Sequence, residues 1–247
     1  MQLKKLKCIN ALDLKILAML FMLCDHLWAT IIPGNQWLTN IGRLAFPIFA
    51  FQIAEGYFKT KNFQKYLKRI FIFALISELP FNLMYGGSLF YPFHQNVLFT
   101  FCIALLFIRW MDRMKPKGRV KYLLSVLLSC VAGFLIGTIT MVDYFGFGVL
   151  TVIVFYLFHE MKYGWIGEFA GLYYINAVMM AGLTISISLF GHRFDFPQQA
   201  LALFSLIPIW MYNEKQGPHN RGIQIACYFF YPVHMLILAL IWLFILN

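Results

Sequence analysis

The chain has 247 residues, of which 61% are hydrophobic and only 12% are charged, and its formal net charge is +10. Soluble domains carry about 25% charged residues, and a soluble fold of this length could not cover so much apolar surface. The composition therefore excludes an ordinary soluble domain. It predicts a polytopic membrane protein that forms one domain over residues 1–247.

Apolar runs close to 20 residues long recur along the chain, and a run of this length spans a bilayer as a helix. We expect an all-α bundle of about nine transmembrane helices, whose first helix is retained because no small-residue cleavage site follows it. The seventh helix is longer than a span requires, so it should be tilted or broken around Met180–Gly182. The expected helices cover roughly residues 12–32, 41–57, 66–85, 96–112, 121–137, 140–158, 164–190, 197–212 and 223–246.

Basic residues gather in alternate connections between these helices. With the N-terminus placed inside, every Lys and Arg except Arg43 and Arg193 falls on the inner side. This positive-inside bias predicts a cytoplasmic N-terminus and a multi-pass location in the cell inner or plasma membrane. The positive charge therefore indicates topology, and no nucleic-acid partner is expected.

The first expected helix contains the stretch MLCDHLW, which places Asp25 and His26 inside an apolar run. Ionisable groups at membrane depth are costly, so this pair is expected to be functional. Lys15 precedes His26 by eleven residues, which returns to nearly the same helix face about 16 Å lower along the axis. Asp25 is offset by about 100° and would face a neighbouring helix or hydrogen-bond an imidazole.

The other ionisable and polar residues sort into two zones by depth. The inner zone is mostly cationic and suits a phosphate-bearing ligand from the cytosol. The outer zone is mixed and resembles a site that handles protons or binds an acceptor. The inner zone comprises Lys15, Lys59, Lys68, Arg69 and Glu55; the outer zone comprises Asp25, His26, Arg43, Glu78, Asn96 and Asp143; the last helix adds Tyr231 and His234 on one face.

Structural roles are open for several of these residues. Lys68 and Arg69 would serve as snorkelling topology residues, and Arg43 and Glu78 would form one ion pair. A neighbouring tyrosine or carbonyl would satisfy His234. The five cysteines have no metal-ligand spacing and read as small apolar residues, so no metal is expected.

Several segments of the chain resemble the TraX family. They are LDLKILAMLFMLCDHLW, GRLAFPIFAFQIAEGYFKTKNFQKYLKRIF, NVLFTF, DYFGFGVL, YNEKQG and YFFYPVH, spread from residue 12 to residue 234. The named member of that family is associated with N-terminal acetylation of conjugative pilin. More distantly, the family is similar to bacterial membrane O-acetyltransferases, in which ten residues separate a basic residue from a histidine on the first helix. Lys15 and His26 match that spacing, although Lys15 stands where arginine is usual and lacks its bidentate fork.

The resemblance implies a membrane acyltransferase that uses acetyl-CoA as acyl donor. His26 would be the general base or a transient acetyl carrier, and Asp25 would orient or charge-stabilise its imidazole. The donor would bind at Lys15, Lys59, Lys68 and Arg69, and the acceptor region would include Arg43, Glu55, Glu78, Asn96, Asp143, Tyr231 and His234. The acceptor would be an amine or hydroxyl of a pilin N-terminus, another membrane peptide, a surface glycan or a lipid.

Two other classes of function compete with this interpretation. A proton-coupled transporter or flippase would use the buried Asp25–His26 pair as a relay, but it should show paired repeats with broken helices, and the sequence has none. An assembly protein would use the polar residues only for helix packing. The density of ionisable groups argues against that reading.

Overall fold

The computed structural model describes residues 7–189 and 192–246, and it is mostly helical. The expected all-α class is confirmed. The helices are α1 (Ala11–Thr30), α2 (Gln36–Gly42), α3 (Ala45–Lys59), α4 (Phe63–Gly86), α5 (Val97–Met114), α6 (Arg119–Ile139), α7 (Phe145–Phe158), α8 (Gly164–Tyr173), α9 (Leu206–Trp210) and α10 (Arg221–Ile241). Short 3₁₀ or π segments cover Lys115–Lys117, Tyr174–Met179, Gln198–Ser205 and Trp242–Leu246, and two strands are β1 (Thr184–Leu189) and β2 (His192–Pro197).

Asparagine side chains cap the N-termini of four of the long helices. Asn10 accepts hydrogen bonds from the backbone N–H groups of Leu12 (2.9 Å) and Asp13 (3.0 Å), and Asp13 accepts one from the Asn10 N–H at 3.0 Å. This reciprocal capping box fixes the first turn of α1. Asn62, Asn96 and Asn220 cap α4, α5 and α10 with a single bond each, in which the side chain accepts from a backbone N–H of the first turn. The helices that carry the predicted site therefore begin at defined residues.

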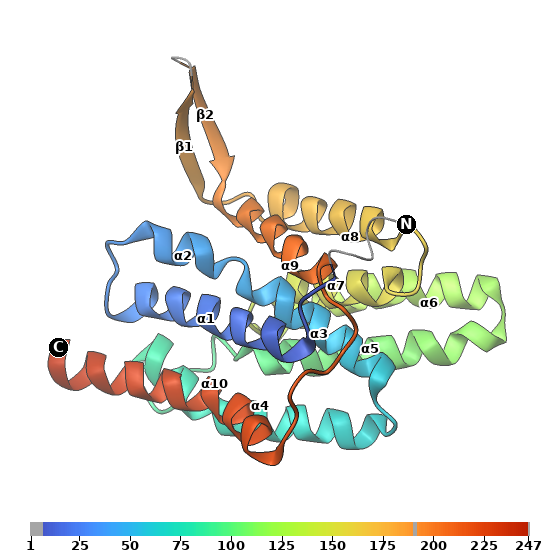
Figure 1. The fold of residues 1–247 in the computed structure, drawn as a ribbon, viewed down its shortest axis with the longest axis horizontal. Coiled ribbons are helices and arrows are strands. Elements are labelled where there is room, and N and C mark those ends of the chain that lie inside the picture. Colours follow the sequence, from blue (N-terminus) through green and yellow to red (C-terminus); the bar gives the residue numbers. More distant parts are fainter. Residues whose placement is uncertain (1–6, 190–191, 247) are drawn as a thin grey trace.

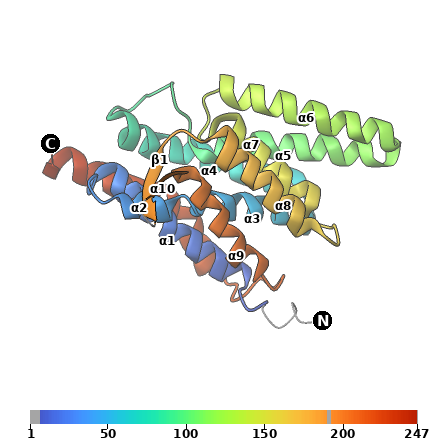
Figure 2. The same cartoon turned by 90° about the horizontal axis from the view of Figure 1, so that it is seen from above.

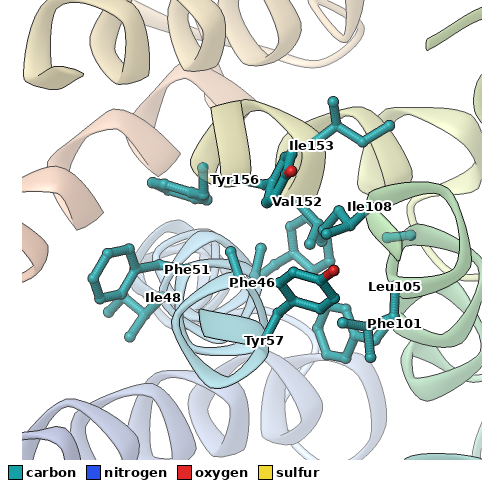
Figure 3. Close-up of a cluster of buried hydrophobic side chains, with 14 of the residues drawn as sticks. Phe46, Ile48, Phe51, Tyr57, Phe101, Leu105, Ile108, Val152, Ile153 and Tyr156 are labelled. Carbon is teal, nitrogen blue, oxygen red and sulfur yellow. The ribbon is translucent and has the colours of Figure 1, made fainter. Parts of the chain in front are cut away.

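The buried core lies between α3, α5 and α7 (Figure 3). Helix α7 reads FGFGVLTVIVFYLF and is apolar on all faces, as expected for a helix surrounded by others. Phe51 and Phe155 meet edge to face with ring centroids 5.6 Å apart. Phe46 stacks on Tyr144 at 3.9 Å. This packing provides a rigid support beside the polar residues.

The outer surface is rich in large apolar side chains. Helix α6 and the stretch Arg221–Ile245 are each long and apolar enough to cross a membrane, by length and composition. Only 22% of the most apolar window of α6 and 28% of that of Arg221–Ile245 are buried, whereas the core helix of a soluble protein is mostly buried. Leu123, Leu127 and Val131 on α6 are all more than half exposed. These two helices point to a membrane environment, and the count of nine spans stays a prediction.

Helices α1, α4 and α10 pack together on one side of the molecule (Figures 1 and 2). Helix α10 lies along α4 and also contacts α1, and α10 ends near the same end of the bundle as α1. We call the space between these three helices the α1–α4–α10 seam. It brings the first and last long helices of the chain together.

The structure differs from the expected helices at two places. The expected helix 41–57 is divided at Arg43–Leu44, where α2 ends and α3 begins. The expected helix 164–190 ends at Met179, close to the predicted break, and the chain then enters β1. Strands β1 and β2 form an antiparallel hairpin that projects away from the bundle, crosswise to the long helices (Figure 1). The apolar composition of 183–190 concealed this hairpin, because a short apolar run fits strand and helix equally well.

Candidate functional site

His26 and His234 meet in the outer half of the α1–α4–α10 seam. The Nδ1 atom of His26 lies 2.8 Å from the Nε2 atom of His234, and both residues are buried. The two rings are tilted by only 9° with centroids 4.9 Å apart, which is the arrangement of two imidazoles bonded edge to edge. Sequence reasoning placed both histidines in the site but did not pair them.

The hydrogen bonds determine which nitrogen of each neutral ring carries the proton. The Nδ1 atom of His234 lies 2.6 Å from the carbonyl oxygen of Phe230. A carbonyl oxygen can only accept, so His234 Nδ1 carries a proton and its Nε2 presents a lone pair. The bond between the rings then requires His26 Nδ1 to be the donor. The remaining nitrogen, His26 Nε2, has a free lone pair and no hydrogen-bond partner within residues 7–189 and 192–246.

Asp25 points away from this pair. Its carboxylate accepts a hydrogen bond from the Thr39 hydroxyl at 2.8 Å and forms an ion pair with Arg43. Arg43 also donates to the Thr39 carbonyl at 3.2 Å. Gly42 permits this approach, because a Cβ atom there would lie 2.4 Å from the Asp25 Cβ. His234, and not Asp25, is therefore the hydrogen-bond partner of the His26 imidazole, whereas Asp25 stabilises the contact between α1 and α2.

The predicted pairing of Arg43 with Glu78 is wrong, because Arg43 pairs with Asp25. Glu78 instead accepts a 2.5 Å hydrogen bond from the side-chain amide of Asn96, which is fully buried. The Asn96 amide oxygen meanwhile caps α5 by accepting from the Leu98 N–H at 3.1 Å. A carboxylate at a helix N-terminus is favourably placed for the helix dipole. Glu78 and Asn96 therefore hold α4 against the start of α5.

Aromatic and polar residues surround the outer side of the histidine pair. The Tyr85 ring lies edge-on to His26 with centroids 6.4 Å apart, and His94 lies 5.3 Å from Tyr85. His94 Nε2 is 3.3 Å from the Asp143 carboxylate. Tyr231, one turn before His234 on α10, has its ring 6.0 Å from that imidazole. The structure thus places Asp143 against His94 on this outer side and Tyr231 beside His234.

The inner end of the seam carries two cations. Lys15 on α1 and Arg69 on α4 both lie toward the inner ends of their helices, and α10 packs against α1 and α4. The Arg69 guanidinium lies over the Tyr66 ring at 5.6 Å and over the Tyr228 ring at 5.4 Å. No carboxylate among the residues that the structure describes forms a salt bridge with Lys15 or Arg69. Two adjacent cations without an acidic partner fit a phosphate-bearing ligand.

Lys59 and Glu55 belong to a separate inner network. The Glu55 carboxylate is bound by Lys59 at 2.6 Å, by the Tyr212 hydroxyl at 2.9 Å and by His159. Lys59 also donates to the Tyr212 hydroxyl and to the Glu214 carbonyl, each at 2.7 Å. Lys59 and Glu55 therefore bind each other and the segment that precedes α10.

That segment, residues 211–217, is tied to the start of the chain. Ile9 pairs with it in a short parallel bridge, in which the Ile9 N–H donates to the Met211 carbonyl at 3.1 Å and the Asn213 N–H donates to the Ile9 carbonyl at 2.8 Å. Lys7 contacts Glu214 at 2.7 Å, and its ammonium holds the pKa of the Glu214 carboxyl below its ordinary value. The inner ends of α1 and α10 are thereby held together.

Sequence reasoning missed His159 and Asp112. Asp112 accepts hydrogen bonds from the hydroxyls of Tyr57 (2.9 Å) and Tyr156 (3.3 Å) at the inner end of the core. His159 reaches Glu55 across 104 residues of sequence. The available signal was a titratable residue at the end of an apolar run, and both residues fit it. Many residues that only mark the membrane topology give the same signal.

Comparisons with known proteins find relatives over almost the whole chain. The model of the TraX protein family matches residues 11–242, which includes every long helix described above. A protein of Dichelobacter nodosus described as a probable fimbrial assembly protein FimC, serogroup H1, is 27% identical over 245 residues, covering 93% of this chain and 94% of that protein. No solved structure matches the chain.

Proposed function

The chain belongs to the TraX family, and from this premise we propose that it is a multi-pass membrane acetyltransferase with its site in the α1–α4–α10 seam. It would transfer an acetyl group from cytosolic acetyl-CoA to an acceptor amine or hydroxyl at the membrane or its outer face. The observation that carries this proposal is the His26–His234 pair, which leaves one imidazole nitrogen of His26 unprotonated. An oriented, unprotonated imidazole is the commonest general base in enzymes.

The proposed base acts on the attacking group of the acceptor. His26 Nε2 takes the proton as the acceptor oxygen or nitrogen forms its bond to the thioester carbonyl carbon. The carbon–sulfur bond then breaks, and the imidazolium returns the proton to the leaving thiolate. His234 stabilises the positive charge on His26 because its Nε2 lone pair accepts the Nδ1 proton throughout. Atoms and protons balance without a further reactant.

The donor would lie along the inner half of the seam. Lys15 and Arg69 are the cations for its phosphates, because neither has an acidic partner in the parts of the chain described. Their helices lead outward to His26, which is about 16 Å above Lys15 along α1 by helical rise. Lys59 is a weaker candidate than the sequence suggested, because Glu55 and Tyr212 already hold its ammonium.

The kind of acceptor is proposed from the Dichelobacter nodosus relative and from the residues on the outer side of the histidine pair. The Dichelobacter nodosus protein is described as a probable fimbrial assembly protein, which favours an acceptor connected with pili. Tyr85, His94 and Tyr231 supply aromatic faces around the histidine pair, and Asp143 supplies a carboxylate. Aromatic faces and a carboxylate suit an amine, which arrives as a cation and releases one proton to water before its neutral nitrogen attacks. We therefore favour a peptide N-terminus over a hydroxyl.

Labelled acetyl-CoA tests the proposed activity. Purified protein in lipid nanodiscs is incubated with acetyl-labelled acetyl-CoA and with membrane peptides that carry a free N-terminal amine. We expect label to appear in the peptide and an equal amount of free coenzyme A to be released. Label that stays in acetyl-CoA with peptide, glycan and lipid acceptors alike would contradict the proposal.

His234 is expected to be a positioning residue for His26. In His234→Phe an aromatic ring still fills the site, but His26 Nδ1–H loses its acceptor, so the proton is free to move to Nε2. Loss of one buried hydrogen bond of about 1–3 kcal/mol predicts turnover about 10–100-fold slower. His234→Gln should recover most of the activity, because its amide oxygen can accept the Nδ1 proton.

The tautomer of His26 distinguishes this role from a structural one. Nitrogen NMR of labelled histidine should show the Nδ1–H form in the wild type and in His234→Gln, and a mixture with the Nε2–H form in His234→Phe. A slow His234→Phe enzyme that retains the wild-type tautomer would contradict the positioning role.

A further inference from the structure

A groove on the outer surface of the bundle lies between α4 and α5. Its volume is about 550 Å³, within the range of about 300–1,000 Å³ typical of small-molecule sites. Its walls are formed by apolar side chains of both helices, and Phe71 (45% exposed) and Leu106 (55% exposed) lie at its open side. The groove therefore faces the surroundings of the bundle, outside the α1–α4–α10 seam.

Polar groups occur only at the ends of this groove. Gln64 and Lys68, from the first turns of α4, mark the inner end. Gln95 and Thr140 close the outer end, where the turn after α6 crosses in front of the start of α5. The lining between them is apolar and includes Leu67, Phe71, Phe99, Cys102, Ile103 and Leu106. The single charged side chain, Lys68, lies at the inner end and is followed by an apolar length, which matches the head group and chain of a lipid.

Lys68 and Arg69 are adjacent in sequence but serve different places. Arg69 lies over the rings of Tyr66 and Tyr228 and so faces α10. Lys68 is exposed and lines the groove on the α5 side, as a rotation of about 100° per residue requires. Within residues 7–189 and 192–246, Lys68 forms no salt bridge with a carboxylate. Its charge is available to a ligand in the groove.

We propose that this groove binds an anionic phospholipid of the inner leaflet. One acyl chain lies between α4 and α5, and the phosphate of the head group contacts the Lys68 ammonium and the Gln64 amide. The proposal rests on the membrane location proposed above but is independent of acetyl transfer. It removes Lys68 from the donor site and leaves Arg69 there.

Charge complementarity selects an anionic lipid over a neutral one. Lipid chains are as apolar as the groove, so the walls alone give little preference among lipids. A single lysine near an anionic head group increases the affinity for the lipid about fivefold. A zwitterionic head group would bring its own positive charge close to Lys68, so its affinity would not be increased.

Competition between two lipids with identical chains tests the proposal. Wild-type protein is placed in nanodiscs with equal amounts of phosphatidylglycerol and phosphatidylcholine, and native mass spectrometry counts the lipids that stay bound on release. Insertion into the nanodisc is scored separately and reports the membrane location itself. We expect the wild type to retain phosphatidylglycerol about five times more often than phosphatidylcholine.

Three variants localise the bound lipid. Lys68→Gln should retain the two lipids equally, whereas Lys65→Gln, an equal charge change on the same helix outside the groove lining, should keep the preference. Ile103→Trp should narrow the apolar part of the groove and reduce the retention of both lipids. A wild-type ratio near one would overturn the proposal. So would an equal loss in Lys65→Gln and Lys68→Gln, which would indicate a diffuse attraction to the basic surface.

Discussion

We expect His26→Gln to transfer acetyl groups about 10²–10⁴ times more slowly than the wild type, which is the usual contribution of a general base. Glutamine keeps the contact in the seam, because its side-chain amide can donate to the Nε2 lone pair of His234 as the His26 Nδ1–H does. It has no group that takes up a proton near neutral pH. The loss should therefore appear in kcat, with the KM for acetyl-CoA little changed.

The measurement is release of free coenzyme A in the presence of a peptide acceptor. His219→Gln is the matched control, since His219 is an exposed histidine before α10 whose contacts are to Gln216 and Gln224. The control should turn over at the wild-type rate. A normal kcat for His26→Gln would show that His26 is not the general base. The remaining candidates for that role would be the residues on the outer side of the histidine pair.

We expect Asp25→Ala to lower the free energy of unfolding by about 2–4 kcal/mol. Breaking one side of a buried ion pair costs about 3–5 kcal/mol because the other charge is left without a partner. The side chains of Arg43 and Asp25 are 21% and 18% exposed, which reduces that cost somewhat. The Thr39 hydroxyl also loses its acceptor. Thermal unfolding in detergent, followed by loss of the monodisperse protein, measures the effect.

A surface ion pair in the same chain provides the comparison. Arg193 and Asp195 in the projecting hairpin are 3.6 Å apart with side chains 73% and 57% exposed. Such pairs contribute about 0–1 kcal/mol, so Asp195→Ala should unfold close to the wild-type temperature. The double variant Asp25→Ala/Arg43→Met should recover much of the lost stability, because it leaves no unpaired charge. Equal shifts in Asp25→Ala and Asp195→Ala would show that the buried pair adds nothing.

Much of the helical framework follows from hydropathy alone. The expected helix 96–112 corresponds to α5 at Val97–Met114, and the expected helix 121–137 to α6 at Arg119–Ile139. Apolar runs of this length leave little choice, because a backbone in an apolar environment must satisfy its own hydrogen bonds. Where polar caps such as Asn96 and Asn220 precede the run, even the first residue is close to the predicted one.

The pairing of side chains could not be obtained in the same way. Asp25 and His26 are neighbours in sequence, but on a helix they point about 100° apart, and Asp25 reaches Arg43 while His26 reaches His234. The same rotation separates Lys68 from Arg69. Residue type and depth identified the candidate site residues. Which of them form contacts was decided by the packing of α1 against α2 and α10.

The His26–His234 contact also has a consequence for the order in which the protein is made. The two histidines are 208 residues apart, on the first and last long helices that the structure describes. Until α10 is synthesised, His26 has no acceptor for its Nδ1–H, and until residues 211–213 are synthesised Ile9 has no backbone partner for its short bridge. Contacts of such long sequence separation form late. A chain that lacks α10 therefore lacks the acceptor that fixes the His26 tautomer, so under the proposed function a truncation before Arg221 should turn over little acetyl-CoA.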